Sequence, residues 1–392
     1  MSPRARSAIA YVALFAGIGA HAPYLLIYYR SLGLGLAETG AAASISALAA
    51  LAAAPAWGQL SDRMRGSPAV FIAATVTALV GTATLAGAGG QPGVVAGASL
   101  VLVGLAGMSP ILDARALETS GRARTGYGGL RAWGSVSYIG SSFLTGVAVE
   151  LWGIRTLFVV LGAAVALTGI IGLTLAPAAA RRAPLGALAA RRVFGRGGLA
   201  GFLVAAFVTW AALVSVMAFY GIRLEDLGAP ATVVGLSAAV GAAVEVPVMV
   251  GFSRLSARFG HERLLVLGAT LFVCRALLAG LSREPAILVL ASAVGGVGFA
   301  LFVVGSVTHV ARGAPGELAA TAQGMFQGVS TGLGQVVAVA AGGAIAARAG
   351  LADLYLISAA VGALGVALVA RSVGCTPGRG GRRIDVTASE MT

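Results

Sequence analysis

Charged residues are scarce in this chain of 392 residues: they make up 10% of it, whereas 58% of the residues are hydrophobic. The mean hydropathy is +0.92. A soluble globule needs more polar side chains than this to cover its surface. The scarcity of charge therefore excludes an ordinary soluble protein and indicates an integral membrane protein.

Other absences narrow the chemistry. There is no lysine, so every strongly basic side chain is an arginine. Two cysteines, Cys274 and Cys375, give neither a disulfide framework nor a metal-ligand spacing. No GxxxxGK[ST] phosphate-binding motif occurs, and the loops are too short for a catalytic domain. We therefore expect no enzyme activity, no catalytic residues, no metal and no cofactor, and any transport must draw on an ion gradient.

Long apolar segments dominate what is present. A segment of roughly 20 residues crosses a hydrocarbon core about 30 Å thick as a helix. A membrane barrel would instead show short alternating segments. The sequence thus predicts an all-α fold of twelve transmembrane helices over residues 9–30, 39–60, 68–89, 93–116, 127–150, 154–176, 199–221, 230–253, 263–281, 285–310, 318–347 and 351–370.

The middle of the chain interrupts this pattern. Residues 177–198 read PAAARRAPLGALAARRVFGRGG, a basic stretch broken by proline and glycine. It divides the spans six and six. We expect one six-helix bundle over residues 1–176, a cytoplasmic basic linker over 177–198, a second bundle over 199–370, and a disordered cytoplasmic tail over 371–392.

The arginines favour one side of the membrane. With the N-terminus in the cytoplasm, most of them fall in cytoplasmic loops, and the opposite loops hold only Arg30, Arg155, Arg223, Arg283 and Arg348. The positive-inside rule then predicts a multi-pass protein of the plasma or inner membrane with both termini cytoplasmic. Topology and the lipid bilayer account for the net charge of +13 without any nucleic acid. We expect a monomer.

Two loops indicate an internal repeat. GQLSDRMRGS follows the second span and SRLSARFGHER follows the eighth, so that Asp62 and Arg63 correspond to Ala257 and Arg258. Repeats related by an axis along the membrane normal are a known transporter architecture, with the substrate site at mid-depth between the halves.

The first loop resembles the loop motif of the major facilitator superfamily. Gly58, Asp62, Arg63 and Arg65 match the motif, although Met64-Arg65-Gly66 departs from its usual order. The resemblance implies an inner gate. In physical terms, Asp62 can meet a helix N-terminus and a basic partner in only one of two conformations. Ordinary solvation of the loop is the alternative.

The stretch from Asp113 through YGGLRAWGS resembles one branch of that superfamily, which holds lactose permease, the 3-phenylpropionate transporter and nucleoside:proton symporters. The spacing from Asp113 to Arg131 and the element Arg131, Trp133, Gly134 carry this resemblance. It implies that Asp113 and Arg131 contact the substrate. Trp133 is a candidate for stacking on a sugar or aromatic ring.

Physical reasoning also joins Asp113 to Arg131. One lies near the end of a predicted span and the other near the start of the next, so a hairpin places them at similar depth. A charge at the bilayer centre costs about 2.5 to 3.5 kcal/mol. An ion pair at about 4 Å returns roughly 4 kcal/mol at an effective dielectric of 20. The pair either binds substrate or holds two helices together, and we expect Arg115 to extend toward the cytoplasmic surface.

A second pair is predicted in the other half. Glu245 and Arg275 each lie on the order of 18 Å from the cytoplasmic end of a span, near the membrane centre. If the two helices are neighbours, the side chains meet. A buried carboxylate that separates from an arginine takes up a proton. We therefore expect Glu245 to carry the proton and Arg275 to set its release; a static bridge is the alternative.

Further candidates for substrate contact are polar residues within spans. His21 and Tyr24 flank Pro23, which predicts a kink in the first helix. Gln323 and Gln327 are four residues apart, on one helical face. They lie in the region where lactose permease would have a lysine, and the His and Glu pair of its tenth span is also absent here. For these residues, a structural role and a substrate contact remain equal alternatives.

These observations predict a secondary transporter that works by alternating access. Its partners would be protons and a small organic solute such as an aromatic acid, a nucleoside or a saccharide, taken up by symport. The alternative is proton-driven efflux of drugs or metabolites. A membrane sensor or scaffold is disfavoured, because it needs no charged pairs at mid-membrane depth.

Overall fold

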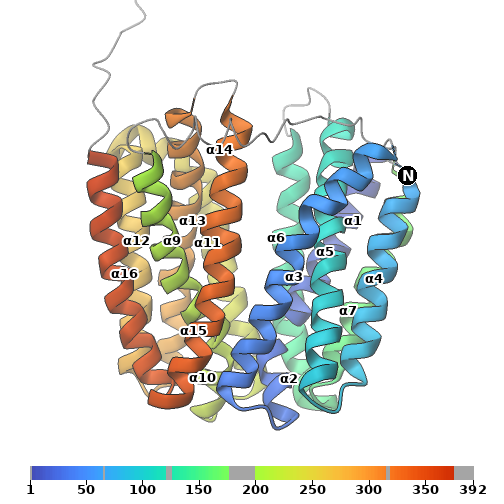
Figure 1. The fold of residues 1–392 in the computed structure, drawn as a ribbon, viewed down its shortest axis with the longest axis horizontal. Helices are drawn as coiled ribbons and strands as arrows, with labels where there is room; N and C mark the ends of the chain where they lie inside the picture. The colour runs from blue at the N-terminus through green and yellow to red at the C-terminus, as the bar shows by residue number, and fades with distance from the viewer. Residues whose placement is uncertain (1, 65–66, 121–125, 176–198, 315–317, 375–392) are drawn as a thin grey trace, which may run out of the picture.

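The computed structural model describes residues 2–64, 67–120, 126–175, 199–314 and 318–374, without the side chains of residues 3, 116–131, 319 and 320. Helices of the described residues form two bundles that stand side by side (Figure 1). The expected linker, most of the expected tail and Arg65 of the loop motif lie outside the described residues.

The first bundle contains seven of the described helices. Three of these helices begin with a side-chain cap. Ser2 and Ser67 accept hydrogen bonds from backbone amides in the first turns of their helices, and Glu38 accepts one from the amide of Gly35. The helices are α1 Pro3–His21, α2 Leu25–Ser31, α3 Leu36–Arg63, α4 Pro68–Ala86, α5 Gln91–Ser120, α6 Gly126–Trp152 and α7 Thr156–Leu173.

The second bundle follows the same plan. Its helices are α9 Leu199–Ala218, α10 Tyr220–Asp226, α11 Ala231–Phe259, α12 His261–Leu281, α13 Pro285–Gly313, α14 Ala319–Phe326, the π-helix η2 Gln327–Leu333, α15 Gly334–Ala349 and α16 Leu351–Gly374. The α14–η2–α15 segment is one continuous rod with a wide turn in its middle.

Eleven spans among the described residues are long and apolar enough to cross a membrane. The helix α6, part of which lies outside the described side chains, is the twelfth. The predicted twelve-helix fold is therefore confirmed. The kink expected at Pro23 is also present, because α1 ends at His21 and α2 begins at Leu25.

Helices that follow one another in sequence are not always neighbours in space. In the first bundle, α1 packs on α6 and α7, and both α3 and α4 pack on α5. In the second bundle, α9 packs on α15 and α16, and both α11 and α12 pack on α13. The pairs α5–α6 and α11–α12 touch only slightly. Each half thus repeats one packing plan.

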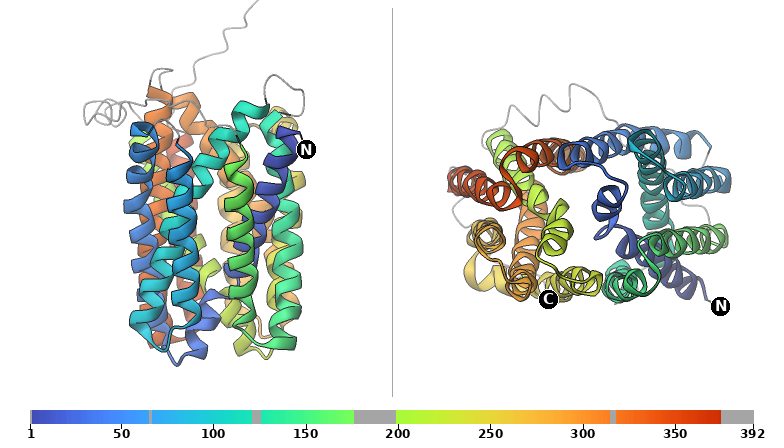
Figure 2. Two further views of the ribbon diagram at one scale, coloured as in Figure 1. Left: turned by 90° about the vertical axis from the view of Figure 1, so that its right-hand side faces the viewer. Right: turned by 90° about the horizontal axis from the view of Figure 1, so that it is seen from below.

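The two ends of the bundles differ. The N-terminus, the end of α7 and the start of α9 lie at one end, which is at the top of Figure 1 and is called the linker end here. The short helices α2 and α10 lie at the opposite end, the far end. Seen from the far end in the right-hand view of Figure 2, the two bundles lie against each other.

The bundles touch through α3 with α15 and through α6 with α11. Buried residues of α3 all lie in its far half, between Thr39 and Ala47. In α11, four of five buried residues lie between Val234 and Ala239. The bundles are therefore closed against each other at the far end and apart toward the linker end.

Glycines permit this close approach. Gly40 of α3 faces Gly343 of α15, and a Cβ on either would lie 2.8 Å from the other's Cα. Gly235 of α11 faces the main chain of α6 at Ser142 in the same way. Gly40 and Gly235 are 195 positions apart, as are Asp62 and Ala257, so the repeat seen in the loops extends to the interface.

Candidate functional site

Asp113 lies half-buried near the linker end of α5. The hydroxyl of Tyr11, on α1, donates a hydrogen bond of 2.5 Å to its Oδ1 atom. Tyr11 is itself buried. A hydrogen bond to a carboxylate is among the stronger kinds, so Tyr11 fixes the orientation of the Asp113 carboxylate. Nothing in the sequence pointed to Tyr11, because the two residues are 102 positions apart.

The ion pair predicted between Asp113 and Arg131 stays a prediction. The side chain of Arg131 lies outside the described residues, although its backbone belongs to α6. The hairpin that was expected to bring the two residues together is loose, since α1 contacts both α5 and α6 more extensively than they contact each other. Trp133, two residues beyond Arg131 on α6, is 55% exposed.

Glu245 and Arg275 do not form the direct ion pair that was expected between α11 and α12. Both residues are described, and the structure shows no ion pair between them. The reason is that α13 packs between α11 and α12. The guanidinium of Arg275 lies instead over the ring of Tyr220, with Cζ 4.4 Å from the ring centroid.

Tyr138 connects these two charges to the other bundle. It lies half-buried on α6, and its hydroxyl interacts electrostatically with both Glu245 and Arg275. Tyr138 was not among the residues predicted from the sequence. Its spacing could have indicated it, since Tyr138 follows Arg131 by two helical turns and so lies on the same face of α6.

His21 and Tyr24 lie on either side of the break between α1 and α2. His21 is buried, and its Nε2 atom has no hydrogen-bond partner among the described residues. Tyr24 donates a hydrogen bond of 2.6 Å to the carbonyl of Ser142 and lies 3.4 Å from the carbonyl of Ala231. In this conformation the Tyr24 hydroxyl joins the two bundles and is not available to a solute.

The two glutamines lie on the α14–η2–α15 segment. The amide of Gln323 donates a hydrogen bond of 2.7 Å to the carbonyl of Val307 on α13. Gln327 begins the π-helix, and its Oε1 atom accepts a bond of 3.0 Å from Thr331. The hydrogen bond of Gln323 joins α14 to α13. Gln327 is exposed and lies in a π-helical turn, a feature that is frequent at functional sites.

Three of the four matching residues of the loop motif, Gly58, Asp62 and Arg63, belong to the described residues. Asp62 and Arg63 are exposed at the end of α3, and a Cβ atom on Gly58 would meet nothing within 4 Å. Among the described residues, the carboxylate of Asp62 has neither a hydrogen bond nor an ion pair. The gating role of Asp62 and its alternative, ordinary solvation of the loop, therefore both stay predictions.

The expectation that Arg115 extends toward the cytoplasmic surface is wrong. Its side chain does not extend to the surface: it is 1% exposed, and Nη1 donates a hydrogen bond of 2.7 Å to the carbonyl of Gly172. The guanidinium lies 5.1 Å from the ring centroid of Phe71. The gap between α4, α5 and α7 is lined by a glycine and an aromatic ring, so the arginine turns inward.

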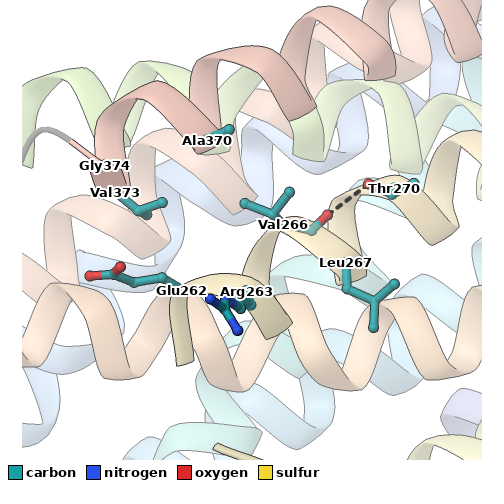
Figure 3. Close-up of a pocket in the computed structure, with 8 residues that line it drawn as sticks. All are labelled: Glu262, Arg263, Val266, Leu267, Thr270, Ala370, Val373 and Gly374. Carbon is teal, nitrogen blue, oxygen red and sulfur yellow. Dashed lines mark hydrogen bonds between the residues drawn. The ribbon is translucent and has the colours of Figure 1, made fainter. Parts of the chain in front are cut away.

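One groove lies apart from all of these residues (Figure 3). It has a volume of about 460 Å³ and opens between the linker ends of α12 and α16, with Glu262 and Arg263 at one edge and Val266, Leu267 and Val373 along it. Among the described residues, the main contacts of α12 and α16 lie within their own bundle. The groove therefore faces away from the junction between the bundles.

Comparison with known proteins agrees with this architecture. A family model described as "MFS_1 like family" matches residues 5–357. The maltose permease of Geobacillus stearothermophilus is 26% identical over 323 residues, which cover 81% of each chain.

Solved structures match over nearly the whole chain. The nucleoside transporter NupG has a TM-score of 0.81 at 17% identity, covering 95% of this chain and 99% of its own. An auto-inhibited peptide transporter of the POT family has a TM-score of 0.74 at 13% identity, covering 95% and 96%. At these identities the likeness is one of fold.

Proposed function

Because the chain belongs to the MFS_1-like family and is a transporter of the major facilitator superfamily, we propose that it imports a small organic solute together with protons by alternating access. The observation that carries this proposal is the set of charged side chains within the bundles. Asp113, Glu245 and Arg275 are half-buried or buried in apolar spans. Charges at such depth are costly and are rare outside functional sites.

The proton would be carried by Glu245. A carboxylate between apolar helices is stabilised by a nearby positive charge and takes up a proton when that charge moves away. Tyr138 belongs to the first bundle, whereas Glu245 and Arg275 belong to the second. A movement of one bundle against the other therefore changes the surroundings of the carboxylate. In this way the conformational change and the proton are coupled.

The solute would bind between the bundles, against Asp113, Arg131 and Trp133. The orientation of Asp113 by Tyr11 supports this, since a preset carboxylate loses less freedom when it accepts hydrogen bonds from a solute. Two similar proteins are named for maltose and for nucleosides. They support a saccharide or a nucleoside over an aromatic acid.

The conformation fits the inward-facing half of such a cycle. The arginine distribution supports a linker end that faces the cytoplasm, in a plasma or inner membrane. We propose that the protein acts there as a monomer. The far end is closed by the contacts of α3 with α15 and of α6 with α11. A solute would then leave toward the linker end.

The proposal is tested by following the external pH of weakly buffered, de-energised cells that express the protein. Maltose, uridine and a phenylpropanoid acid are added separately. Symport carries protons inward with the solute, so the medium becomes alkaline for the correct class. The same signal should vanish in Glu245→Gln, while downhill exchange of labelled solute continues.

Three other results would contradict parts of the proposal. Acidification on adding the solute indicates exchange against protons and hence an efflux mechanism. Uptake of labelled solute with no change in pH contradicts proton coupling. Equal loss of proton movement and exchange in Glu245→Gln contradicts its role as the proton carrier.

A further inference from the structure

Gly295 of α13 faces the side chain of Arg275 on α12. A Cβ atom added at Gly295 would lie 2.8 Å from Nη1 and 3.0 Å from Nε of Arg275, and closer still to its Cδ atom. Arg275 is 9% exposed, so it has little room to withdraw. Only glycine at this position lets the guanidinium occupy its present place.

The ring of Tyr220 provides a second wall. Cζ of Arg275 lies 4.4 Å from the centroid of this ring, a distance at which a cation and an aromatic face attract each other. The Tyr220 hydroxyl donates a hydrogen bond of 2.6 Å to the carbonyl of Leu288. Leu288 is on α13, two turns before Gly295. Helix α13 therefore supplies the gap for the arginine and also holds the ring beside it.

We propose that Gly295 is a positioning residue for proton coupling: with Tyr220 and Leu288 it forms a slot that keeps the guanidinium of Arg275 in one place, within electrostatic reach of Tyr138. This inference rests on the proposed function, in which Arg275 sets the release of a proton from Glu245. Glu245 and Arg275 lie in the same bundle, so an arginine held in this slot keeps one position relative to the carboxylate. What then changes when the bundles move is the distance of both charges from Tyr138 of the other bundle.

Glu245 is the carboxylate that lies, together with Arg275, within electrostatic reach of Tyr138. The carboxylate of Asp226, at the far end, is bound by Arg30 at 2.7 Å. Arg223 donates to the carbonyl of Ser282. The titratable and charged groups around the slot come from α6, α10, α11 and α16. They are Tyr138, Tyr220, Arg223, Asp226, Glu245 and Tyr355.

The test is an infrared titration of the full chain in lipid vesicles, which needs no solute. The C=O band of a protonated carboxyl group is assigned to Glu245 by its loss in Glu245→Gln. In Arg275→Gln, the midpoint at which this band appears should move to higher pH, because the positive charge is gone. Gly295→Ala should move it in the same direction by on the order of 0.5 to 1 pH unit, because the arginine is displaced.

A double variant and a matched control separate positioning from general disturbance. In Gly295→Ala with Arg275→Gln, the midpoint should equal that of Arg275→Gln alone, since there is no arginine left to position. Gly313→Ala is the control on the same helix, because its Cβ would meet only Leu199 among the described residues, at 3.7 Å. It should leave the midpoint unchanged.

The outcomes distinguish this inference from the function on which it rests. If no band depends on Glu245, the proposed function fails and the inference with it. If Arg275→Gln shifts the band and Gly295→Ala does not, the inference alone is wrong. A further shift in the double variant likewise overturns it. Should Gly295→Ala not fold, Tyr220→Phe, which frees the ring from Leu288, must give the shift instead.

Discussion

Arg30 of α2 and Asp226 of α10 form an ion pair of 2.7 Å that joins the two bundles at the far end. Their side chains are 36% and 38% exposed. A pair this exposed contributes about 0.2 to 1 kcal/mol, because water screens it. It therefore helps to close the far end without locking it, as an equilibrium between two conformations requires.

Removing this pair should favour opening of the far end. We choose Arg30→Gln, because Glu225 beside Asp226 would remain as a partner for Arg30 if Asp226 were replaced. The open population should rise by roughly 1.4- to 5-fold. It can be measured by electron–electron distances between spin labels at Gly89→Cys and Arg283→Cys, on the far-end loops, in a chain with Cys274→Ser and Cys375→Ser.

The charge swap is the control for that prediction. Arg30→Asp combined with Asp226→Arg should restore the wild-type distances, because the attraction is re-formed with its signs exchanged. If the swapped chain behaves like Arg30→Gln, the ion pair does not set the equilibrium.

Substitution of Gly235 should disturb the far-end-closed state far more than loss of the ion pair does. Its Cβ would collide with the carbonyl oxygen of Ser142 on α6. Overpacking of this kind costs about 1 to 3 kcal/mol. Gly235→Ala should therefore depopulate the far-end-closed state by roughly 5- to 150-fold, as seen with the same pair of spin labels.

Gly251→Ala is the matched control on α11, since a Cβ there would meet nothing within 4 Å. It should leave the distances unchanged. Equal effects of the two substitutions would show that helix propensity, and not the contact with α6, is responsible.

The features that the sequence predicted are those with a local cause. Twelve spans follow from hydropathy, and the kink follows from Pro23, whose ring cannot fit a regular helix. The repeat at Asp62 and Ala257 was visible in two short loops, and Gly40 and Gly235 extend it at the same spacing.

The features that it missed depend on which helices become neighbours. A hairpin model places α5 beside α6 and α11 beside α12, but α1 and α13 take those positions. Tyr11 therefore meets Asp113, and Gly295 meets Arg275. Packing between helices in a membrane is decided by shape and small residues along whole faces. No spacing between two charges can reveal it.

We predict that Asp62 stabilises the conformation in which the bundles are closed at the linker end. Gly40 contacts Gly343, and a Cβ on Gly332 would lie against Leu51, so α3 and α15 run antiparallel in one register. Continued along the chain, this register places Asp62 opposite the first turn of α14. A carboxylate there interacts with the helix N-terminus by about 0.3 to 1 kcal/mol.

Asp62→Asn should then reduce the linker-end-closed population by roughly 1.7- to 5-fold and slow transport accordingly. Glu262→Gln is a suitable control, because it removes an exposed acid at the same end on α12, whose contacts lie within its own bundle. Unchanged transport and unchanged access from the two sides in Asp62→Asn would mean that the loop is merely solvated.

Arg115 allows a prediction about stability. It is buried with one hydrogen bond to the carbonyl of Gly172, and its Nε atom has no partner among the described residues. The cost of burying such a charge often exceeds what it gains, and apolar replacements of similar size are then neutral or stabilising. Arg115→Met should therefore melt at the same temperature as the wild type or higher. Arg115→Ala should melt several degrees lower, because it leaves a cavity beside Phe71.

Thermal unfolding of the purified protein in detergent distinguishes these two variants, and solute uptake should be normal in Arg115→Met. If Arg115→Met folds as stably as the wild type but no longer transports, the arginine serves the transport cycle. The buried side chain of Arg115 beside Phe71 would then be a functional charge in the first bundle, comparable to Arg275 in the second.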